Sequence, residues 1–213
     1  MYKPLSLAIA ALDIDKATAI AKEYLEQGVP IIDIVESSRV GVEMVGKHYQ
    51  NGEYFLADLV MSEAILKEIT DLVEPYLPVP VAAEEGQTPQ IITGTIEGDI
   101  HDLGKNIVIY LLRSSGYNVL DLGVDVPISK FLDAARGSEA KIIGICFLLT
   151  YGIAKVKQLV ESFEEEGLRH GRTLIIGGYA ADEATREYVR ADYCASTTVD
   201  IVPLFDSITG FQR

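Results

Sequence analysis

The sequence predicts a protein of two parts, a helical bundle followed by an α/β domain with a parallel sheet between helices. Three observations support this division. Apolar residues recur with helical spacing through residues 1–77. A proline-rich, polar stretch without a period follows at residues 78–89 and is typical of a linker. In residues 90–213, short apolar runs alternate with helical patterns, which indicates a sheet covered by helices on both faces.

Four helices account for the first part. We place them at residues 5–12, from 13 or 15 to 28, 30–49, and 54–75. Asp13 and Asp15 are both suitable N-caps for the second helix. Short turns between the helices predict a compact four-helix bundle. We expect the apolar residues Phe55, Leu59 and Met61 of the last helix to lie in its core.

Strand-like runs and helical patterns alternate in the second part. The runs lie at residues 91–96, 117–122, 141–147, 173–176 and 191–195, and the helical patterns at 103–115, 128–136, 152–167, 181–189 and 199–209. Continuous apolar strands separated by helices are typical of a flavodoxin/Rossmann-like domain with a five-stranded parallel sheet. In this architecture ligands bind beyond the carboxyl ends of the strands.

The composition argues against binding to nucleic acid and against insertion into a membrane. Lys and Arg total 18 against 32 Asp and Glu, a formal net charge of −14, whereas a nucleic-acid binder needs a basic patch. The sequence contains no apolar run long enough to span a bilayer, and its first residues do not resemble a signal peptide. Cys146 and Cys194 lie in apolar surroundings, which predicts buried, reduced thiols. We therefore expect a cytoplasmic protein.

The segment Glu97–Asn106 follows the first predicted strand, where this fold places its ligand. Gly98 and Gly104 allow sharp turns and a close approach of the backbone to a ligand. His101 is suited to bind a transition metal, and Asp99 could accept a hydrogen bond from its other ring nitrogen. From the loop alone, a helix-capping aspartate beside a surface histidine explains the motif equally well. A zinc site or a phosphate loop is disfavoured, because the further ligands and glycines that they need are absent from the sequence.

Two further elements at later strand ends decide between these interpretations. The three elements are Asp99, His101 and Gly104, then Cys146 and Leu148, then Gly177 and Gly178. Their order and spacing resemble the pattern of the vitamin B12-binding family, which is Asp-x-His-x-x-Gly, Ser-x-Leu and Gly-Gly. The resemblance covers nearly the whole chain, because the first part looks like the helical cap of cobalamin methyltransferase modules.

Two positions depart from the family pattern. Cys146 replaces the serine, and a thiol is a poorer hydrogen-bond partner than a hydroxyl. Gly152 stands where some members have a serine that extends the relay from histidine to aspartate. We therefore expect simpler proton coupling at His101.

The resemblance implies that cobalamin binds in the base-off, His-on state. His101 would be the lower cobalt ligand, and Asp99 would hydrogen-bond it, so that these two form the catalytic pair. The implied cofactor contacts are Gly98, Asp99, Ile100, His101, Asp102, Gly104, Cys146, Leu148, Thr150, Gly177, Gly178 and Ala195. The bundle would shield the upper face of the cofactor, and residues 78–89 would be the hinge that lets it move away.

By the same resemblance, the chain is similar to corrinoid proteins of methanol, methylamine and O-demethylase systems and to the cobalamin module of methionine synthase. Such a subunit belongs to the transferase class but is not catalytic alone. It accepts a methyl group on cobalt(I) from a methyl-donor methyltransferase and carries it as methylcobalamin. It then passes the methyl group to a second methyltransferase with a tetrahydrofolate or thiol acceptor. A reductive activase is the third implied partner.

Several alternatives stay open on the sequence alone. The methyl donor is undecided among methanol, a methylamine, betaine and an aromatic methyl ether. A cobalamin-sensing regulatory module would also join a helical bundle to this α/β domain. The small subunit of a cobalamin mutase and a flavodoxin-like protein without cobalamin are further candidates.

Overall fold

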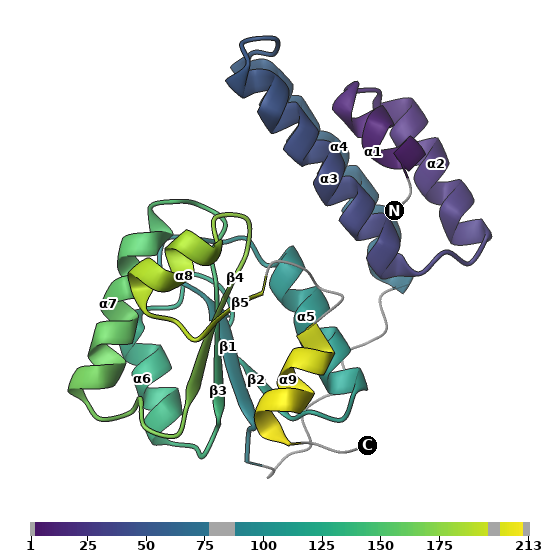
Figure 1. Ribbon diagram of the computed structural model, residues 1–213. Coiled ribbons are helices and arrows are strands. Elements are labelled where there is room, and N and C mark those ends of the chain that lie inside the picture. The colour runs from purple at the N-terminus through teal and green to yellow at the C-terminus, as the bar shows by residue number, and fades with distance from the viewer. Residues whose placement is uncertain (1–2, 77–87, 196–200, 211–213) are drawn as a thin grey trace. The chain divides into compact units, whose positions relative to one another are not determined.

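The computed structural model describes residues 3–76, 88–195 and 201–210. The chain divides into two compact units, Met1–Val79 and Pro80–Arg213, which are drawn in Figure 1 and described separately below. Residues 77–87, which include most of the predicted linker at 78–89, lie outside the described residues. Among the helices of the described ranges, none is both long and apolar enough to cross a membrane.

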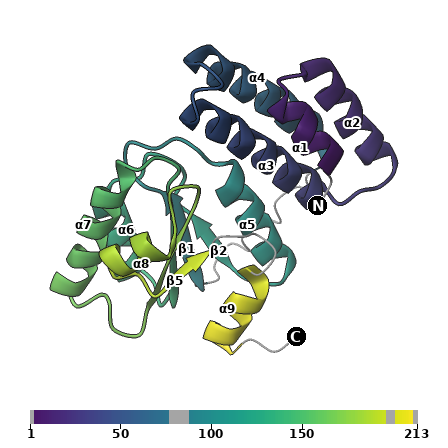
Figure 2. The same cartoon turned by 45° about the horizontal axis from the view of Figure 1, so that its top comes forward.

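The first unit contains the four predicted helices. They are α1 (Lys3–Ala10), α2 (Ile14–Glu26), α3 (Ile31–Gln50) and α4 (Leu56–Val73), and a single 3-10 turn, Glu74–Tyr76, follows α4. Of the two candidate caps for α2, the structure uses Asp13, whose carboxylate accepts a hydrogen bond from the amide of Lys16 at 3.0 Å. Figure 2 shows α3 and α4 running alongside α1 and α2.

A close approach of α1 to α3 holds this unit together. A Cβ on Gly41 would lie 2.7 Å from the Cβ of Ile9, so only a glycine lets the two helices pack at this distance. Fully buried side chains of α1, α3 and α4, including Ile34 and Ile65, fill the core around this crossing. The hydroxyl of the buried Ser38 donates to the carbonyl of Ile34 at 2.9 Å, so its polar group is satisfied inside the helix.

The expectation that Phe55 and Met61 lie in the core was wrong. Their exposed fractions are 74% and 50%, and Leu59 is only half-buried. Phe55 precedes the first turn of α4 in an extended conformation, so it does not share the helical face that packs inward. Met61 is next to that face, whose buried residues include Ile65 and Ile69. The prediction from apolar character alone was therefore wrong for these two side chains, which the first unit does not cover.

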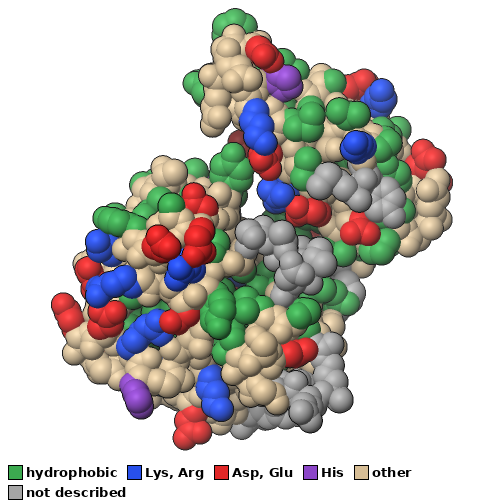
Figure 3. Space-filling model, in the orientation of Figure 1, with side chains coloured by type: hydrophobic (Ala, Val, Ile, Leu, Met, Phe, Trp, Pro, Cys, Tyr) green, Lys and Arg blue, Asp and Glu red, His purple; other side chains and the backbone are tan. Residues whose placement is uncertain are grey.

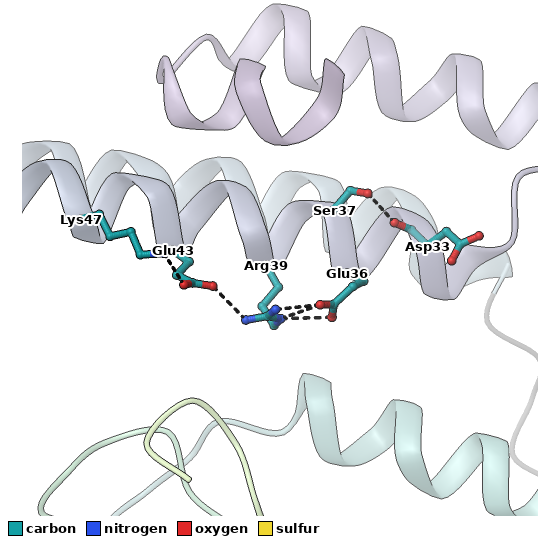
Figure 4. A network of polar contacts seen from close by, with 6 residues as sticks. All are labelled: Asp33, Glu36, Ser37, Arg39, Glu43 and Lys47. Atoms are coloured by element: carbon teal, nitrogen blue, oxygen red, sulfur yellow. Dashed lines mark hydrogen bonds and ion pairs between the residues drawn. The ribbon is translucent and has the colours of Figure 1, made fainter. Parts of the chain in front are cut away.

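A row of charged residues stabilises the outer face of α3 (Figure 4). Arg39 donates to Glu36 at 2.7 Å and to Glu43 at 3.3 Å, and Lys47 donates to Glu43 at 2.7 Å. These pairs are three or four residues apart, the spacing at which side chains meet on one helix face. Each such exposed pair stabilises a helix by about 0.2–0.5 kcal/mol.

The second unit is a five-stranded parallel sheet with helices on both faces, as predicted. In the described residues the order is β2-β1-β3-β4-β5. The strands are β1 (Ile91–Thr95), β2 (Val119–Asp121), β3 (Ile142–Cys146), β4 (Thr173–Gly177) and β5 (Tyr193–Ala195). The helices are α5 (Leu103–Ser114), α6 (Ile128–Arg136), α7 (Gly152–Glu165), α8 (Glu183–Val189) and α9 (Ile201–Thr209).

Two hydrophobic cores lie on opposite faces of this sheet. Helices α5 and α9 pack on one face, where Ile91 of β1 and Ile142 of β3 are buried. Helices α6, α7 and α8 cover the other face, where the next residues, Ile92 and Ile143, are buried. Because successive strand residues point to opposite faces, both must be apolar, which explains the continuous apolar runs.

The outer surface of α7 and α8 is mixed in charge. On the face drawn in Figure 3, Lys and Arg side chains lie singly among Asp and Glu over these helices. Arg190 pairs with Glu164 at 3.1 Å, and Arg186 pairs with Glu183 at 2.6 Å. Such exposed pairs contribute at most about 1 kcal/mol each.

The strand order changes direction at β1. From β1 the chain crosses to β2 on one side and later to β3 on the other side. The loops that follow β1 and β3 therefore diverge at the carboxyl ends of these neighbouring strands. This is the place where open parallel sheets bind their ligands.

Candidate functional site

The predicted site residues meet at the carboxyl edge of the sheet. Thr95, Cys146, Gly177 and Ala195 are paired in register across β1, β3, β4 and β5. The loop that carries His101 begins directly after this row. The structure therefore brings together elements that are far apart in the sequence.

The pairing of His101 with Asp99 is the central feature of the loop. Nδ1 of His101 lies 2.6 Å from Oδ1 of Asp99. The side chain of Asp99 is fully buried, whereas that of His101 is 46% exposed. Within the described residues, Nε2 of His101 has no hydrogen-bond partner. A carboxylate at Nδ1 holds the ring proton there and leaves the Nε2 lone pair free to bind a metal.

The second oxygen of Asp99 is held by backbone amides. Oδ2 accepts hydrogen bonds from the amides of Leu148 at 2.6 Å and Leu149 at 3.3 Å. Burial would raise the pKa of Asp99, but these bonds and those from the amide and ring of His101 outweigh it and lower the pKa. Asp99 is therefore a carboxylate. These amide contacts could not be predicted from the sequence, because every residue type except proline carries the same amide.

Asp99 is not the cap of α5. That position belongs to Asp102, whose side chain makes no capping bond and instead accepts from the Asn106 amide group at 3.1 Å. Asp99 does accept from the amide of His101 at 3.0 Å, but its main partners are the ring and the loop after β3. The simpler interpretation, a capping aspartate beside an unrelated histidine, does not describe this geometry.

Other residues around the loop were not singled out from the sequence. Thr95 donates to the carbonyl of His101 at 2.9 Å, and Asp125 accepts from the amide of Gly98 at 2.7 Å. The hydroxyl of Tyr151 donates to the carbonyl of Gly98. These partners come from β1, from the segment after β2 and from the segment after β3, so their proximity depends on the sheet.

The cysteines are free but less buried than predicted. Both residues are half-buried, Cys146 as the last residue of the middle strand β3 and Cys194 in the outermost strand β5. Burial raises the pKa of the Cys146 thiol to about 11, although the nearby Lys105 and a hydrogen bond with Thr93 act in the opposite direction. Cys146 is therefore a neutral thiol. Beyond it, Leu148 and Thr150 are exposed at the start of the next loop.

The two glycines after β4 have different surroundings. A Cβ on Gly178 would lie 2.0 Å from the carbonyl oxygen of Phe147, and the φ of Gly178 is 118°, so no other residue fits. A Cβ on Gly177 would meet Ala195 at ordinary contact distance, 3.6–3.8 Å. The need for glycine at Gly178 thus comes from the adjacent loop after β3.

Space remains open beside the first turn of α5. A Cβ on Gly104 would meet no atom within 4 Å, and the side chain of Ile100 is 71% exposed. Beneath this surface, the ammonium group of Lys105 is buried and contacts both oxygens of Asp121 at 2.9 Å. The His101 loop therefore presents an exposed apolar side chain and open space, and the nearby Lys105 is fixed by its ion pair with Asp121.

Comparisons with known proteins found B12-binding relatives along nearly the whole chain. A family model described as a B12 binding domain matches residues 89–202, and a second model with the same description matches residues 1–74. A corrinoid protein of Desulfitobacterium hafniense is 34% identical over 207 residues, 97% of this chain and 96% of that protein. Dimethylamine corrinoid protein 3 of Methanosarcina acetivorans is 34% identical over 85% of this chain and 84% of its own length.

Solved structures are similar over the same extent. The monomethylamine corrinoid protein of Methanosarcina barkeri matches with a TM-score of 0.79 at 26% identity, covering 99% of this chain and 98% of that one. A chain of the methanol:cobalamin methyltransferase complex of Methanosarcina barkeri matches with a TM-score of 0.54 at 26% identity. That match covers 98% of this chain and 80% of the other.

Proposed function

The chain belongs to the B12-binding family of corrinoid proteins from methyltransferase systems, and on this premise we propose that it is a methyl-carrier subunit. Its cofactor is cobalamin. The subunit would accept a methyl group from a methyl-donor methyltransferase and pass it to a second methyltransferase. One observation carries the proposal: a half-exposed histidine with a free Nε2, held by a buried carboxylate at the ligand-binding edge of the sheet.

The residues of the loop fit a lower cobalt ligand. Cobalamin, when bound, would supply a cobalt atom that can take up and release a methyl group. His101 would bind the cobalt through Nε2, giving the base-off, His-on state. The open space at Gly104 and the exposed Ile100 suit the approach of a large planar ring. The backbone of Gly98–Asp102 would contact its side chains.

Asp99 would keep the proton of the pair at Nδ1 of His101. Its carboxylate accepts from that nitrogen on one side and from two backbone amides on the other. Backbone amides do not pass on a proton, so they would not extend the relay beyond Asp99. With Gly152 in the position of a third relay residue, we propose that proton exchange at this site is confined to these two residues.

The ends of β3, β4 and β5 would form the pocket for the nucleotide tail. We assign Cys146, Leu148 and Thr150 to its wall, and Gly177, Gly178 and Ala195 to its far side, following the match to the family motif. Cys146 offers a neutral thiol there, because its pKa is raised to about 11. The tail would therefore find a weak donor where other members have a hydroxyl.

The partners follow from the same premise. The corrinoid relatives are named for dimethylamine and trimethylamine, and one similar structure is part of a methanol:cobalamin methyltransferase complex. We propose a donor methyltransferase, an acceptor methyltransferase and a reductive activase as partners, all in the cytoplasm.

The cobalt ligand is tested by reconstitution. We would load wild-type protein, His101→Ala and the control His170→Ala with hydroxocobalamin, remove free cofactor and record ultraviolet–visible spectra. His170 lies exposed in the turn before β4, at the opposite edge of the sheet. We expect stoichiometric corrinoid in all three and a base-off spectrum only in His101→Ala. Wild-type protein that retains no corrinoid, or a His101→Ala spectrum equal to the wild type, would refute the proposal.

The carrier role needs a second measurement. A cobalamin-sensing module would also bind the cofactor but would not exchange methyl groups with a methyltransferase. Reduced holoprotein should take up a methyl group only when a cognate donor methyltransferase and its substrate are present. Trials with methanol, methylamines, betaine and aromatic methyl ethers would identify the donor.

A further inference from the structure

The segment after β2 runs alongside the His101 loop. Beyond the end of β1, the amide of Glu97 donates to the carbonyl of Val126 at 2.9 Å, and the amide of Val126 donates to the carbonyl of Thr95 at 3.0 Å. Ile96 and Val126 form a parallel bridge. This pairing extends the sheet past its last regular residues and brings Asp125 next to the loop.

Asp125 makes two bonds to the loop at successive residues. Its carboxylate accepts from the amide of Gly98 at 2.7 Å. Its own amide donates to the carbonyl of Asp99 at 2.9 Å. One residue from the segment after β2 therefore holds the amide of Gly98 and the carbonyl of Asp99.

The backbone of Asp125 is adapted to this contact. Its φ is 51°, a left-handed conformation that few residues with a Cβ adopt, and which aspartate and asparagine tolerate best. Backbone conformations of this kind persist where the surroundings require them, often at functional sites. In this conformation both the amide and the carboxylate of Asp125 point to the same loop.

Gly98 is held from the other side as well. The hydroxyl of Tyr151, from the segment after β3, donates to the carbonyl of Gly98. The φ of Gly98 is 88°, and a Cβ there would lie 3.1 Å from the Tyr151 ring, so the turn needs a glycine. The segments that follow β2 and β3, the two neighbours of β1, thus hold the amide and the carbonyl of one residue.

We propose that Asp125 is a positioning residue for the cobalt ligand. The carboxylate of Asp125 fixes the amide of Gly98, the residue before Asp99, and its amide fixes the carbonyl of Asp99. The carboxylate of Asp99 is held by the amides of Leu148 and Leu149. The half-exposed ring of His101 takes its orientation from Asp99. Asp125 acts through this chain of contacts and sets the fraction of cofactor that is bound by His101. The inference rests on the proposed function.

The test compares two substitutions of Asp125. Asp125→Gly keeps the left-handed backbone and removes the bond to Gly98, whereas Asp125→Asn keeps an acceptor oxygen and removes the charge. Each protein is labelled with 15N-histidine, loaded with hydroxocobalamin and reduced to cobalt(II). Splitting by the 15N nucleus in the electron paramagnetic resonance spectrum then reports His101 ligation, because the benzimidazole of the cofactor carries 14N. We expect the ratio of His-on to His-off cofactor to fall about tenfold in Asp125→Gly, the size expected for a lost charge-assisted hydrogen bond. Asp125→Asn should stay within about twofold of the wild type.

Further variants make the result decisive. Arg190→Gly exchanges another left-handed residue, φ 63°, before β5 at the opposite edge of the sheet, and should leave the ratio unchanged. Tyr151→Phe removes the second bond to Gly98 and should lower the ratio as well. If Asp125→Gly does not fold, Asp125→Ala, which removes the same bond to Gly98, is the deciding variant. A wild-type ratio of His-on to His-off cofactor in the deciding variant would overturn the proposed role of Asp125 but not the proposed function. Absence of 15N splitting from the wild type would refute the proposed function as well.

Discussion

Replacing Asp99 by asparagine keeps the size of the side chain but removes half of its capacity to accept hydrogen bonds. In the wild type, four N–H groups donate to the carboxylate: the amide and ring of His101, and the amides of Leu148 and Leu149. An asparagine offers one oxygen and one NH2 group, so it can accept on only one of the two sides.

We expect the asparagine oxygen to face Leu148 and Leu149, because an NH2 group there would meet two fixed donors in a buried place. Its NH2 group then faces Nδ1 of His101, which must accept and moves its ring proton to Nε2. The amide of His101 loses its acceptor, which costs about 1–3 kcal/mol. Asp99→Asn should therefore lower the free energy of unfolding by about this amount and abolish His101 ligation without removing the histidine.

Denaturant unfolding of the apoprotein measures the first effect, and electron paramagnetic resonance of the cobalt(II) holoprotein measures the second. The pKa of Asp99 is lowered from 3.8, so its stabilisation is complete above about pH 4 and is lost as pH falls through the folded-state pKa. The stability difference between wild type and Asp99→Asn should shrink in that acid range. A variant with wild-type nitrogen splitting, or a difference that grows in acid, would refute this account of the carboxylate.

Three further outcomes follow from the packing. Gly178→Ala should destabilise the α/β unit by about 3 kcal/mol or more, because its Cβ would lie 2.0 Å from the carbonyl oxygen of Phe147. Thermal unfolding measures this loss, and an unfolding temperature equal to that of the wild type would contradict the prediction. Gly41→Ala should destabilise the helical unit by about 1–3 kcal/mol, since its Cβ would lie 2.7 Å from a side-chain carbon of α1. Gly46→Ala on the same helix meets no atom within 4 Å and should stabilise by about 0.5–1 kcal/mol, so equal effects would disprove the packing argument. The Cys146 thiol has a pKa of about 11 against an ordinary 9.0, so it should have about a hundredfold less thiolate near pH 8. The rate of alkylation would be measured with Cys194 replaced by serine. A rate equal to that of a free thiol would contradict the raised pKa.

Spacing along the chain predicted the order of the elements well. The helix expected at 128–136 is found at Ile128–Arg136, and the strand expected at 173–176 is found at Thr173–Gly177. Helical period and continuous apolar runs are local signals, because one element must bury its own face. The pairing of Asp99 with His101 was predictable for the same reason, since the two residues are only two positions apart.

Apolar character predicted burial less well. Phe55 and Met61 were expected in the core, yet they are among the exposed large hydrophobic side chains of the described residues. Hydrophobicity indicates that a side chain gains from leaving water, but it does not say whether its own unit provides a surface to pack on.

The sequence by itself indicated the side chain that we propose as the cobalt ligand and placed it at a strand end. It could not indicate what holds that side chain. Leu148 is 49 residues from Asp99, and Asp125 and Tyr151 are 27 and 53 residues from Gly98. These contacts exist only because β1 lies between β2 and β3 in register, and an amide or a turn aspartate carries no signal of its distant partner. Only the tertiary structure decided the geometry of the site.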